Sequence, residues 1–140
     1  MDEIYRTKVF SSGGRNGHVK SDDGIIDIDL STPKTMGGKR DATNPEQLFA
    51  AGYAACFEHS MQHIARSIAL PVKATAVEAE VAMYKTLDEE YRMSVTLKAF
   101  VKGIDQEAAD DLVKRAHDIC PYSGAVKNNV DVSMVAQVVG

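Results

Sequence analysis

The sequence predicts an α+β fold, in which strands come in runs instead of alternating one by one with helices. Two observations support this class. Residues 48–57 form an uncharged segment within a long helical stretch, and segments of alternating apolar and polar residues lie both before and after that stretch. The 140 residues are enough for one domain, residues 1–140, with a sizeable hydrophobic core. The expected order is three strands, a helix, two strands, a second helix and a closing strand.

Composition and charge argue against several classes of protein. The net charge of −4 disfavours a nucleic acid or an anionic membrane as partner, because both attract basic proteins. The longest apolar stretch is far shorter than a membrane-spanning helix, which needs roughly 20 residues. The N-terminus begins with acidic residues and lacks the apolar segment of a signal peptide. We therefore expect a cytoplasmic protein with neither a membrane nor a nucleic acid as partner.

The first third of the chain has the pattern of a small antiparallel meander. Three short segments are rich in strand-forming residues, and turns marked by glycine separate them. The Asn16-Gly17 pair is a typical signal for a tight turn between strands. The expected strands are residues 4–10, 18–20 and 25–30, and a loop is expected over 31–42.

A long central helix is expected over residues 45–69. Thr43 or Asn44 can cap its start, Pro45 is tolerated in the first turn, and the helix stops before the next proline. Because residues 48–57 are apolar on every side of the helix, this part should be buried. A domain of this size rarely surrounds such a helix with six short strands. We therefore expect a homodimer, in which a second copy of the chain covers part of the helix.

The second half of the chain predicts a β-hairpin, a second helix and a closing strand. Residues 72–84 and 91–101 alternate apolar and polar side chains around a polar turn, which is typical of paired strands. A helical apolar stripe follows over residues 106–119, and Cys120-Pro121 ends it. Residues 130–139 have the pattern of the closing strand.

Two cysteines are the first candidates for chemistry: Cys56 in the central helix and Cys120 at the end of the second helix. A persistent structural disulfide is uncommon in a reducing cytosol. The pair therefore indicates redox chemistry, metal binding, or two unrelated buried thiols.

Nearby histidines leave two further interpretations open. His59 and His63 follow Cys56 on the same face of the helix, and a thiol with two imidazoles can bind zinc. His117 lies one turn before Cys120, where the two could form a cysteine–histidine hydrolase pair. No tight ligand pair elsewhere supports zinc, and no third partner marks a hydrolase.

Two charged residues could act on a reactive thiol. Arg15 lies between glycines in a turn, where it could reach a thiolate and lower the pKa of the thiol. Glu46 suits the first helical turn. It precedes Cys56 by about 15 Å along a straight helix, so direct contact between the two needs either a bend at Gly52 or a second subunit.

Residues 43–57, with the sequence TNPEQLFAAGYAACF, closely resemble the signature of the Ohr/OsmC family. Three more segments match the organic hydroperoxide resistance (Ohr) branch in the expected order: residues 13–17, 30–34 and 120–123. The resemblance covers nearly the whole chain. A motif of this length, together with three further matching segments in the expected order, is a far more specific signal than the presence of two cysteines.

The resemblance implies an OsmC-like α+β fold and an intertwined homodimer with active sites at the subunit interface. It implies a thiol-dependent peroxidase, a redox enzyme of the oxidative stress response that reduces organic hydroperoxides without a cofactor. Cys56 matches the peroxidatic cysteine and Cys120 the resolving one. Arg15 and Glu46 match the residues that hold the thiolate and orient the peroxide. The reductant of the family is a lipoyl dithiol carried on a protein.

The chain departs from the family pattern after Phe57, where Glu58-His59-Ser60 replaces the common apolar or small residues. This difference bears on the mouth of the pocket and on the preference among hydroperoxides. Two alternatives remain: an OsmC-branch peroxidase with another substrate range, and a zinc-binding or redox-sensing module using Cys56, His59 and His63. An apolar pocket wall that favours organic peroxides is expected from Met36, Leu48, Phe49 and Phe57.

Overall fold

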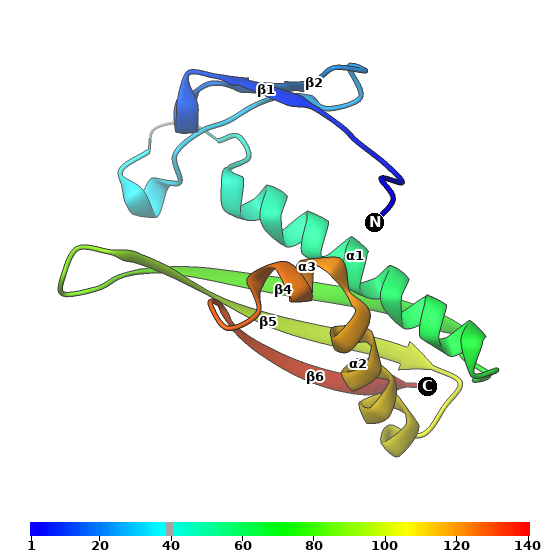
Figure 1. Ribbon diagram of the computed structural model, residues 1–140. Helices are drawn as coiled ribbons and strands as arrows, with labels where there is room; N and C mark the ends of the chain where they lie inside the picture. The colour runs from blue at the N-terminus through cyan, green and yellow to red at the C-terminus, as the bar shows by residue number, and fades with distance from the viewer. Residues whose placement is uncertain (39–40) are drawn as a thin grey trace. The chain divides into compact units, whose positions relative to one another are not determined.

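The computed structural model describes residues 1–38 and 41–140 (Figure 1). The chain falls into two compact units, Met1–Leu48 and Phe49–Gly140. Part of the loop expected over residues 31–42, at positions 39 and 40, lies outside the described residues.

The first unit contains the expected antiparallel meander. Strands β1 (Val9–Ser12), β2 (His18–Ser21) and β3 (Asp27–Asp29) pair in this order, each antiparallel to the next. A 3-10 turn, η1 (Gly14–Asn16), joins the first two strands.

The bounds of the first and third strands differ from the prediction. The first strand starts at Val9 and includes Ser11 and Ser12, which were expected to break it; the break comes at Gly13, whose φ of 84° is left-handed. The third strand loses residues 25 and 26 because side chains compete for their backbone N–H groups. Ile25 donates to the Asp23 carboxylate and Ile26 to the Ser21 hydroxyl.

A short connection links the meander to the central helix. It contains the 3-10 turn η2 (Lys34–Met36) and a parallel bridge between Leu30 and Thr43. Helix α1 (Pro45–Ser67) then begins as expected, with Asn44 as its cap: the Asn44 side chain accepts a hydrogen bond of 2.8 Å from the Gln47 N–H.

The second unit is built on a three-stranded sheet. Strands β4 (Ala74–Lys85) and β5 (Tyr91–Lys102) form the predicted hairpin, and β6 (Asp131–Val139) lies beside β5 and parallel to it. A parallel partner needs a crossover connection, which helices α2 (Gln106–Ile119) and α3 (Pro121–Val126) supply. Helix α2 has the predicted bounds, and the Asp105 carboxylate caps it by accepting from the Ala108 N–H. Helix α3 was not predicted, because Pro121 was interpreted only as a stop signal and instead stands at the first position of a new helix.

The core of this unit lies on one face of the sheet, under α1 and α2 (Figure 1). The register places Val77, Leu97 and Ala136 on that face, with Glu78 opposite Lys98 on the other. The largest fully buried side chains come from both helices and the central strand: Tyr53, Phe57, Met61, Leu97, Leu112, Val95 and Val101. The result is a helix layer packed on a sheet, as expected for an α+β fold.

The single chain does not bury α1 on every side. Its buried side chains lie along one stripe, from Tyr53 through Phe57 and Met61 to Ala65, whereas Ala51 and Ala55 are exposed. The single chain therefore leaves part of the helix exposed, because the sheet covers only one side of it. Coverage of the rest by a second copy stays a prediction.

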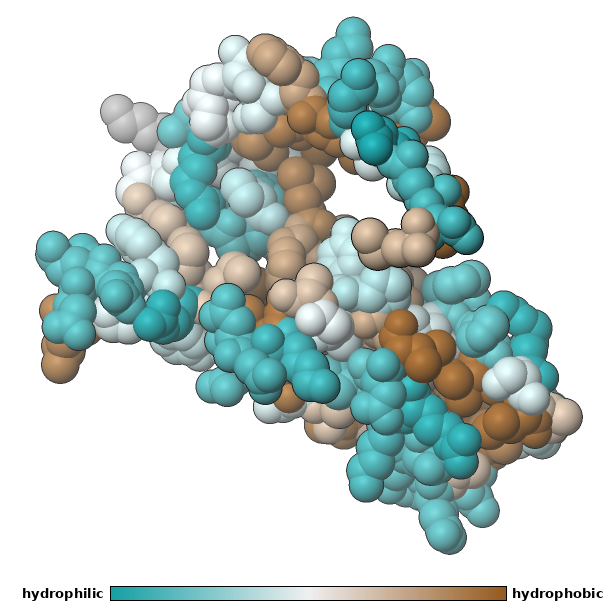
Figure 2. All heavy atoms as spheres, viewed as in Figure 1, coloured by the Kyte–Doolittle hydropathy of each residue, from teal (hydrophilic) through white to brown (hydrophobic). Residues whose placement is uncertain are grey.

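Large apolar side chains are also exposed in both units. In the first unit, Ile4, Tyr5 and Phe10 are each at least three-quarters exposed. In the second unit, a hydrophobic band reaches the surface between the C-terminal half of α1 and α2 (Figure 2). Among the described residues, no helix is long and apolar enough to cross a membrane.

Gly103→Ala should destabilise the protein by about 1–3 kcal/mol, the cost of a strained backbone position. Gly103 has φ of 107°, and an added Cβ would lie 2.6 Å from the Pro71 carbonyl oxygen. The free energy of unfolding from urea denaturation measures the loss. Gly124→Ala is the matched control, because its Cβ would meet no atom within 4 Å. Equal stability of the two variants would contradict this account of Gly103.

Candidate functional site

The second unit brings the two cysteines together. Cys56 lies on α1 and is half-buried, and Cys120 lies at the α2–α3 junction with only 2% of its surface exposed. Both thiols are free, and the Cys120 thiol donates a weak hydrogen bond to the Cys56 sulfur at an Sγ–Sγ distance of 3.7 Å. A disulfide needs about 2 Å between the sulfurs, so a small rearrangement separates this pair from a covalent bond.

Contacts with α1 hold the junction between α2 and α3 in place. Tyr53, one turn before Cys56, shares a hydrogen bond of 2.7 Å with the buried Ser123 hydroxyl. The Tyr122 ring packs against α1 at Gly52, where an added Cβ would lie 2.8 Å from the tyrosine oxygen. The rings of Tyr53 and Tyr122 also pack together, with centroids 5.8 Å apart. These contacts fix the position of Cys120 relative to Cys56.

Burial raises the pKa of the Cys56 thiol. A hydrogen bond from the Tyr122 backbone N–H acts in the opposite direction, because it favours the thiolate, and the neighbouring Cys120 raises the pKa further. Within the unit Phe49–Gly140, no described cationic side chain opposes the effect of burial. Cys56 is thus held mostly as a thiol by its surroundings in this unit, and a cation is needed to make it strongly nucleophilic.

The first unit holds the other two predicted site residues as an ion pair. Arg15, in η1, donates a hydrogen bond of 3.1 Å from Nη2 to Oε2 of Glu46, in the first turn of α1. The Arg15 Nη1 atom is buried and lies 2.8 Å from Oε1, a Coulombic contact without hydrogen-bond alignment. The two-point contact orients the guanidinium plane. Glu46 is therefore the ion-pair partner of Arg15. Helix α1 runs without interruption from Pro45 to Ser67.

The alternative zinc site is not formed. The described residues contain no group of three or more His, Cys, Asp or Glu side chains that could hold a metal ion, so Cys56, His59 and His63 are not such a group. His59 and His63 are both exposed.

The cysteine–histidine hydrolase pair is not formed either. His117 Nδ1 lies 2.9 Å from the Ser123 hydroxyl, and the two side chains share a hydrogen bond. The sequence interpretation missed this connection to Ser123, and through it to Tyr53. The only signal for it was a polar serine directly after the Cys-Pro-Tyr segment.

Two expectations for the pocket also change. Glu58 is held towards β4, where its carboxylate accepts hydrogen bonds from Thr75 at 2.7 Å and from Gln62 at 3.4 Å. Phe57, expected in the pocket wall, is fully buried in the core. Phe49 stays half-buried beside the rings of Tyr53 and Tyr122.

Comparison with known proteins identifies relatives along nearly the whole chain. The organic hydroperoxide resistance protein OhrB of Bacillus subtilis (strain 168) is 42% identical over 132 residues, which cover 94% of this chain and 96% of the relative. The crystal structure of an organic hydroperoxide resistance protein OsmC from Legionella pneumophila has a TM-score of 0.95 at 43% identity, covering 98% of this chain and all of that one.

A third relative is a putative organic hydroperoxide resistance protein from Vibrio cholerae, solved with captopril bound in one of its active sites. Its TM-score is 0.92 at 43% identity, and the match covers 97% of this chain and 94% of that one. The model of the family described as OsmC-like protein matches residues 37–135. The chain belongs to the OsmC-like family, in its organic hydroperoxide resistance (Ohr) branch.

Proposed function

We propose that the protein is a thiol-dependent peroxidase that reduces organic hydroperoxides to alcohols through Cys56 and Cys120. The observation that carries the proposal is the pair of free thiols with sulfurs 3.7 Å apart, one half-buried and one buried. The names of the relatives support it, because they are organic hydroperoxide resistance proteins at about 42% identity.

In the first step, the Cys56 thiolate attacks the distal oxygen of the hydroperoxide. An S–O bond forms, the O–O bond breaks, and the leaving alkoxide takes up a proton to become the alcohol. The sulfur is oxidised to a sulfenic acid as the peroxide is reduced. Cys56 suits this step better than Cys120, because it is the more exposed of the two thiols.

In the second step, the Cys120 sulfur attacks the Cys56 sulfenic acid. The S–S bond forms, the S–O bond breaks, and the hydroxide leaves as water with the thiol proton. A dithiol then reduces the disulfide by thiol–disulfide exchange and becomes a disulfide itself. We take this reductant to be a lipoyl group on a protein partner, as the resemblance to the family implies.

Arg15 supplies the cation that Cys56 needs, and Glu46 orients it. A guanidinium stays charged at all relevant pH values, so its approach favours the thiolate even where burial opposes it. Glu46 acts through its two-point contact with Arg15, which removes the need for direct contact between Glu46 and Cys56.

The active form is a homodimer. The exposed alanines on α1 and the exposed Ile4, Tyr5 and Phe10 are apolar surfaces that the single chain leaves uncovered. The three short strands of the first unit bury almost no apolar side chain, which is unusual for a stable sheet. Coverage by a second copy explains why residues 48–57 of α1 are apolar even on the side of the helix that the single chain leaves exposed.

One equivalent of tert-butyl hydroperoxide should convert both thiols to a disulfide. We expect thiol titration to find no free thiol afterwards, and intact mass to fall by about two hydrogens per chain. In Cys120→Ser the mass should instead rise, as Cys56 stops at the sulfenic acid or is oxidised further. Survival of both thiols in the wild-type protein would disprove the peroxidase mechanism.

Arg15→Ala should lower the rate constant for the reaction with peroxide by about 100-fold, as expected when a preorganised donor is lost. The rate should rise only at higher pH than in the wild type, because burial keeps the pKa of the Cys56 thiol raised and no guanidinium opposes it. Glu46→Gln should cause a smaller loss in the same direction. Stopped-flow kinetics across pH measures both effects.

Arg115→Ala is the control for Arg15→Ala, because Arg115 forms an exposed ion pair with Asp111 within α2. It should react like the wild type. A wild-type rate and pH profile in Arg15→Ala would remove Arg15 from the mechanism.

Sedimentation analysis should give twice the 15.2 kDa mass of one chain. Ala51→Arg places a charge on the exposed face of α1 and should shift the protein towards the monomer, because burying an unpaired charge in an interface is costly. Leu87→Arg is the matched control, since Leu87 is fully exposed at the turn between β4 and β5. A wild-type protein that sediments as a monomer would refute the dimer.

A further inference from the structure

Three side chains from three helices form a continuous hydrogen-bonded chain in the second unit. The Tyr53 hydroxyl on α1 lies 2.7 Å from the Ser123 hydroxyl on α3, and this lies 2.9 Å from His117 Nδ1 on α2. Tyr53 is fully buried and Ser123 is 3% exposed, whereas His117 is half-buried. The chain therefore runs from the protein interior towards the surface.

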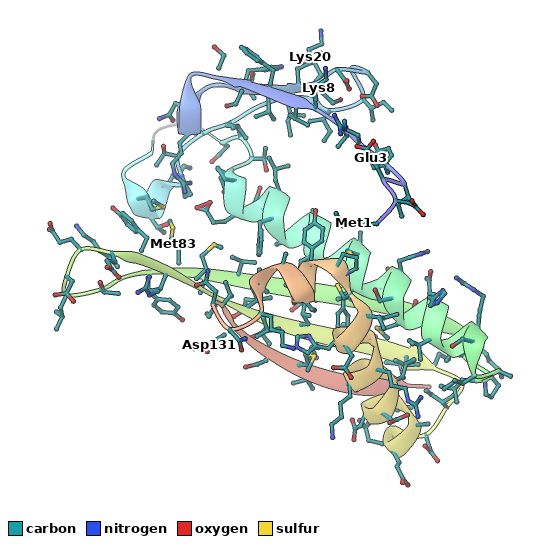
Figure 3. The ribbon with its side chains drawn as sticks, in the orientation of Figure 1. Met1, Glu3, Lys8, Lys20, Met83 and Asp131 are labelled. Atoms are coloured by element: carbon teal, nitrogen blue, oxygen red, sulfur yellow. The ribbon has the colours of Figure 1, made fainter. Side chains whose placement is uncertain are left out.

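The outer end of this chain opens into a cavity of about 520 Å³. His117 and Ser123 line it together with the segment that joins α3 to β6. The other charged residues that line this cavity are Lys127 and Asp131; Asp131 stands at the start of β6 (Figure 3). Water and small solutes can enter such a cavity, so His117 can exchange protons with the solvent.

The inner end of the chain is Tyr53, on the same helix as Cys56. Tyr53 is one helical turn before Cys56. Burial raises the pKa of the Tyr53 hydroxyl, the hydrogen bond with Ser123 lowers it, and negative charge on Cys120 or Cys56 raises it further. Tyr53 precedes Cys56 by three residues, and its partner Ser123 follows Cys120 by three residues. As an un-ionised group, the phenol can donate a proton.

The direction of the hydrogen bonds depends on the protonation of His117. A neutral His117 with a bare Nδ1 accepts from Ser123, and Ser123 then accepts from Tyr53. A protonated His117 donates to Ser123 instead, and Ser123 donates to the Tyr53 oxygen. In this second arrangement the Tyr53 O–H is free to donate to another acceptor, such as a thiolate.

Exposure decides which sulfur needs this proton. Cys56 is the more accessible half of the disulfide, so a reducing thiolate attacks Cys56 and Cys120 leaves. Cys120, which is only 2% exposed, then leaves as a thiolate in a buried position. Bulk water has little access to it, and a proton must come through the protein.

We propose that His117, Ser123 and Tyr53 form a proton relay from the cavity to the Cys120 thiolate released when the disulfide is reduced. The inference rests on the proposed function and assigns a step within it. Tyr53 donates its proton to the Cys120 sulfur and takes one from Ser123, Ser123 takes one from His117 Nδ1, and water restores the proton on His117. The second thiol of the dithiol then displaces Cys56, so the reductant leaves as a disulfide and both cysteines are reduced.

The test separates the reductive step from the oxidative one. The protein is first oxidised with one equivalent of tert-butyl hydroperoxide, and disulfide formation is checked by intact mass. Stopped-flow mixing with excess dihydrolipoamide, in H₂O and in D₂O, then gives the rate of reduction. Failure to form the disulfide in the wild type would refute the proposed function, which keeps that outcome distinct from failure of the relay.

Ser123→Ala and Tyr53→Phe should slow the reduction by about 100-fold, within the range of general acid catalysis, and should abolish its solvent isotope effect. The rate of Cys56 oxidation by peroxide, measured in the same variants, shows how far each substitution disturbs the thiol pair, and the loss in the reductive rate should exceed any loss in the oxidative rate. Ser123→Thr keeps the hydroxyl and should restore the reductive rate. His59→Gln, at an exposed histidine of α1, is the control for histidine replacement.

His117→Ala provides the readout that a merely structural network would not give. Imidazole added to the buffer can enter the open cavity and replace the lost side chain as proton donor. We expect it to accelerate reduction of His117→Ala and to leave the wild type unchanged. Slow reduction that imidazole does not rescue, with an unchanged isotope effect in the three variants, would show that the residues only position Cys120. Wild-type reduction rates in all variants would also overturn the relay.

Discussion

The approach of the α2–α3 junction to α1 is the contact on which the proposed chemistry depends. Two features of α1 make it possible: Gly52 leaves room for the Tyr122 ring, and Tyr53 holds Ser123 by a buried hydrogen bond. Together they place the Cys120 sulfur 3.7 Å from that of Cys56. Two thiols that are 64 residues apart in the sequence thus come into contact because a short stretch of helix has the right small and polar side chains.

The two cysteines and Arg15 belong to different units of the chain. Burial raises the pKa of Cys56, and the Tyr122 N–H compensates only in part. The guanidinium of Arg15 belongs to the other unit and is held there by Glu46. In the proposed mechanism, the reactivity of Cys56 therefore depends on a residue outside the unit that contains it.

Local signals predicted those parts of the fold that local physics determines. The second helix was predicted at residues 106–119 because one apolar stripe runs along it, and the structure has the same bounds with Asp105 as the cap. Strand 25–30 was too long because the side chains of Ser21 and Asp23 bind its backbone. The residue types of the site could also be read from the sequence. The link from Tyr53 to Ser123 could not, because its partners are 70 residues apart and meet only after the helices pack.

The unequal exposure of the two thiols has opposite consequences in the two halves of the proposed cycle. A buried Cys120 is shielded from peroxide, so oxidation begins at Cys56 and ends in a disulfide instead of two over-oxidised sulfurs. The same burial keeps bulk water, and the protons it could supply, away from Cys120 when the disulfide is reduced. A fold that gains selectivity by burying one thiol must therefore also provide a proton at that sulfur. The chain of Tyr53, Ser123 and His117 lies where such a donor is needed.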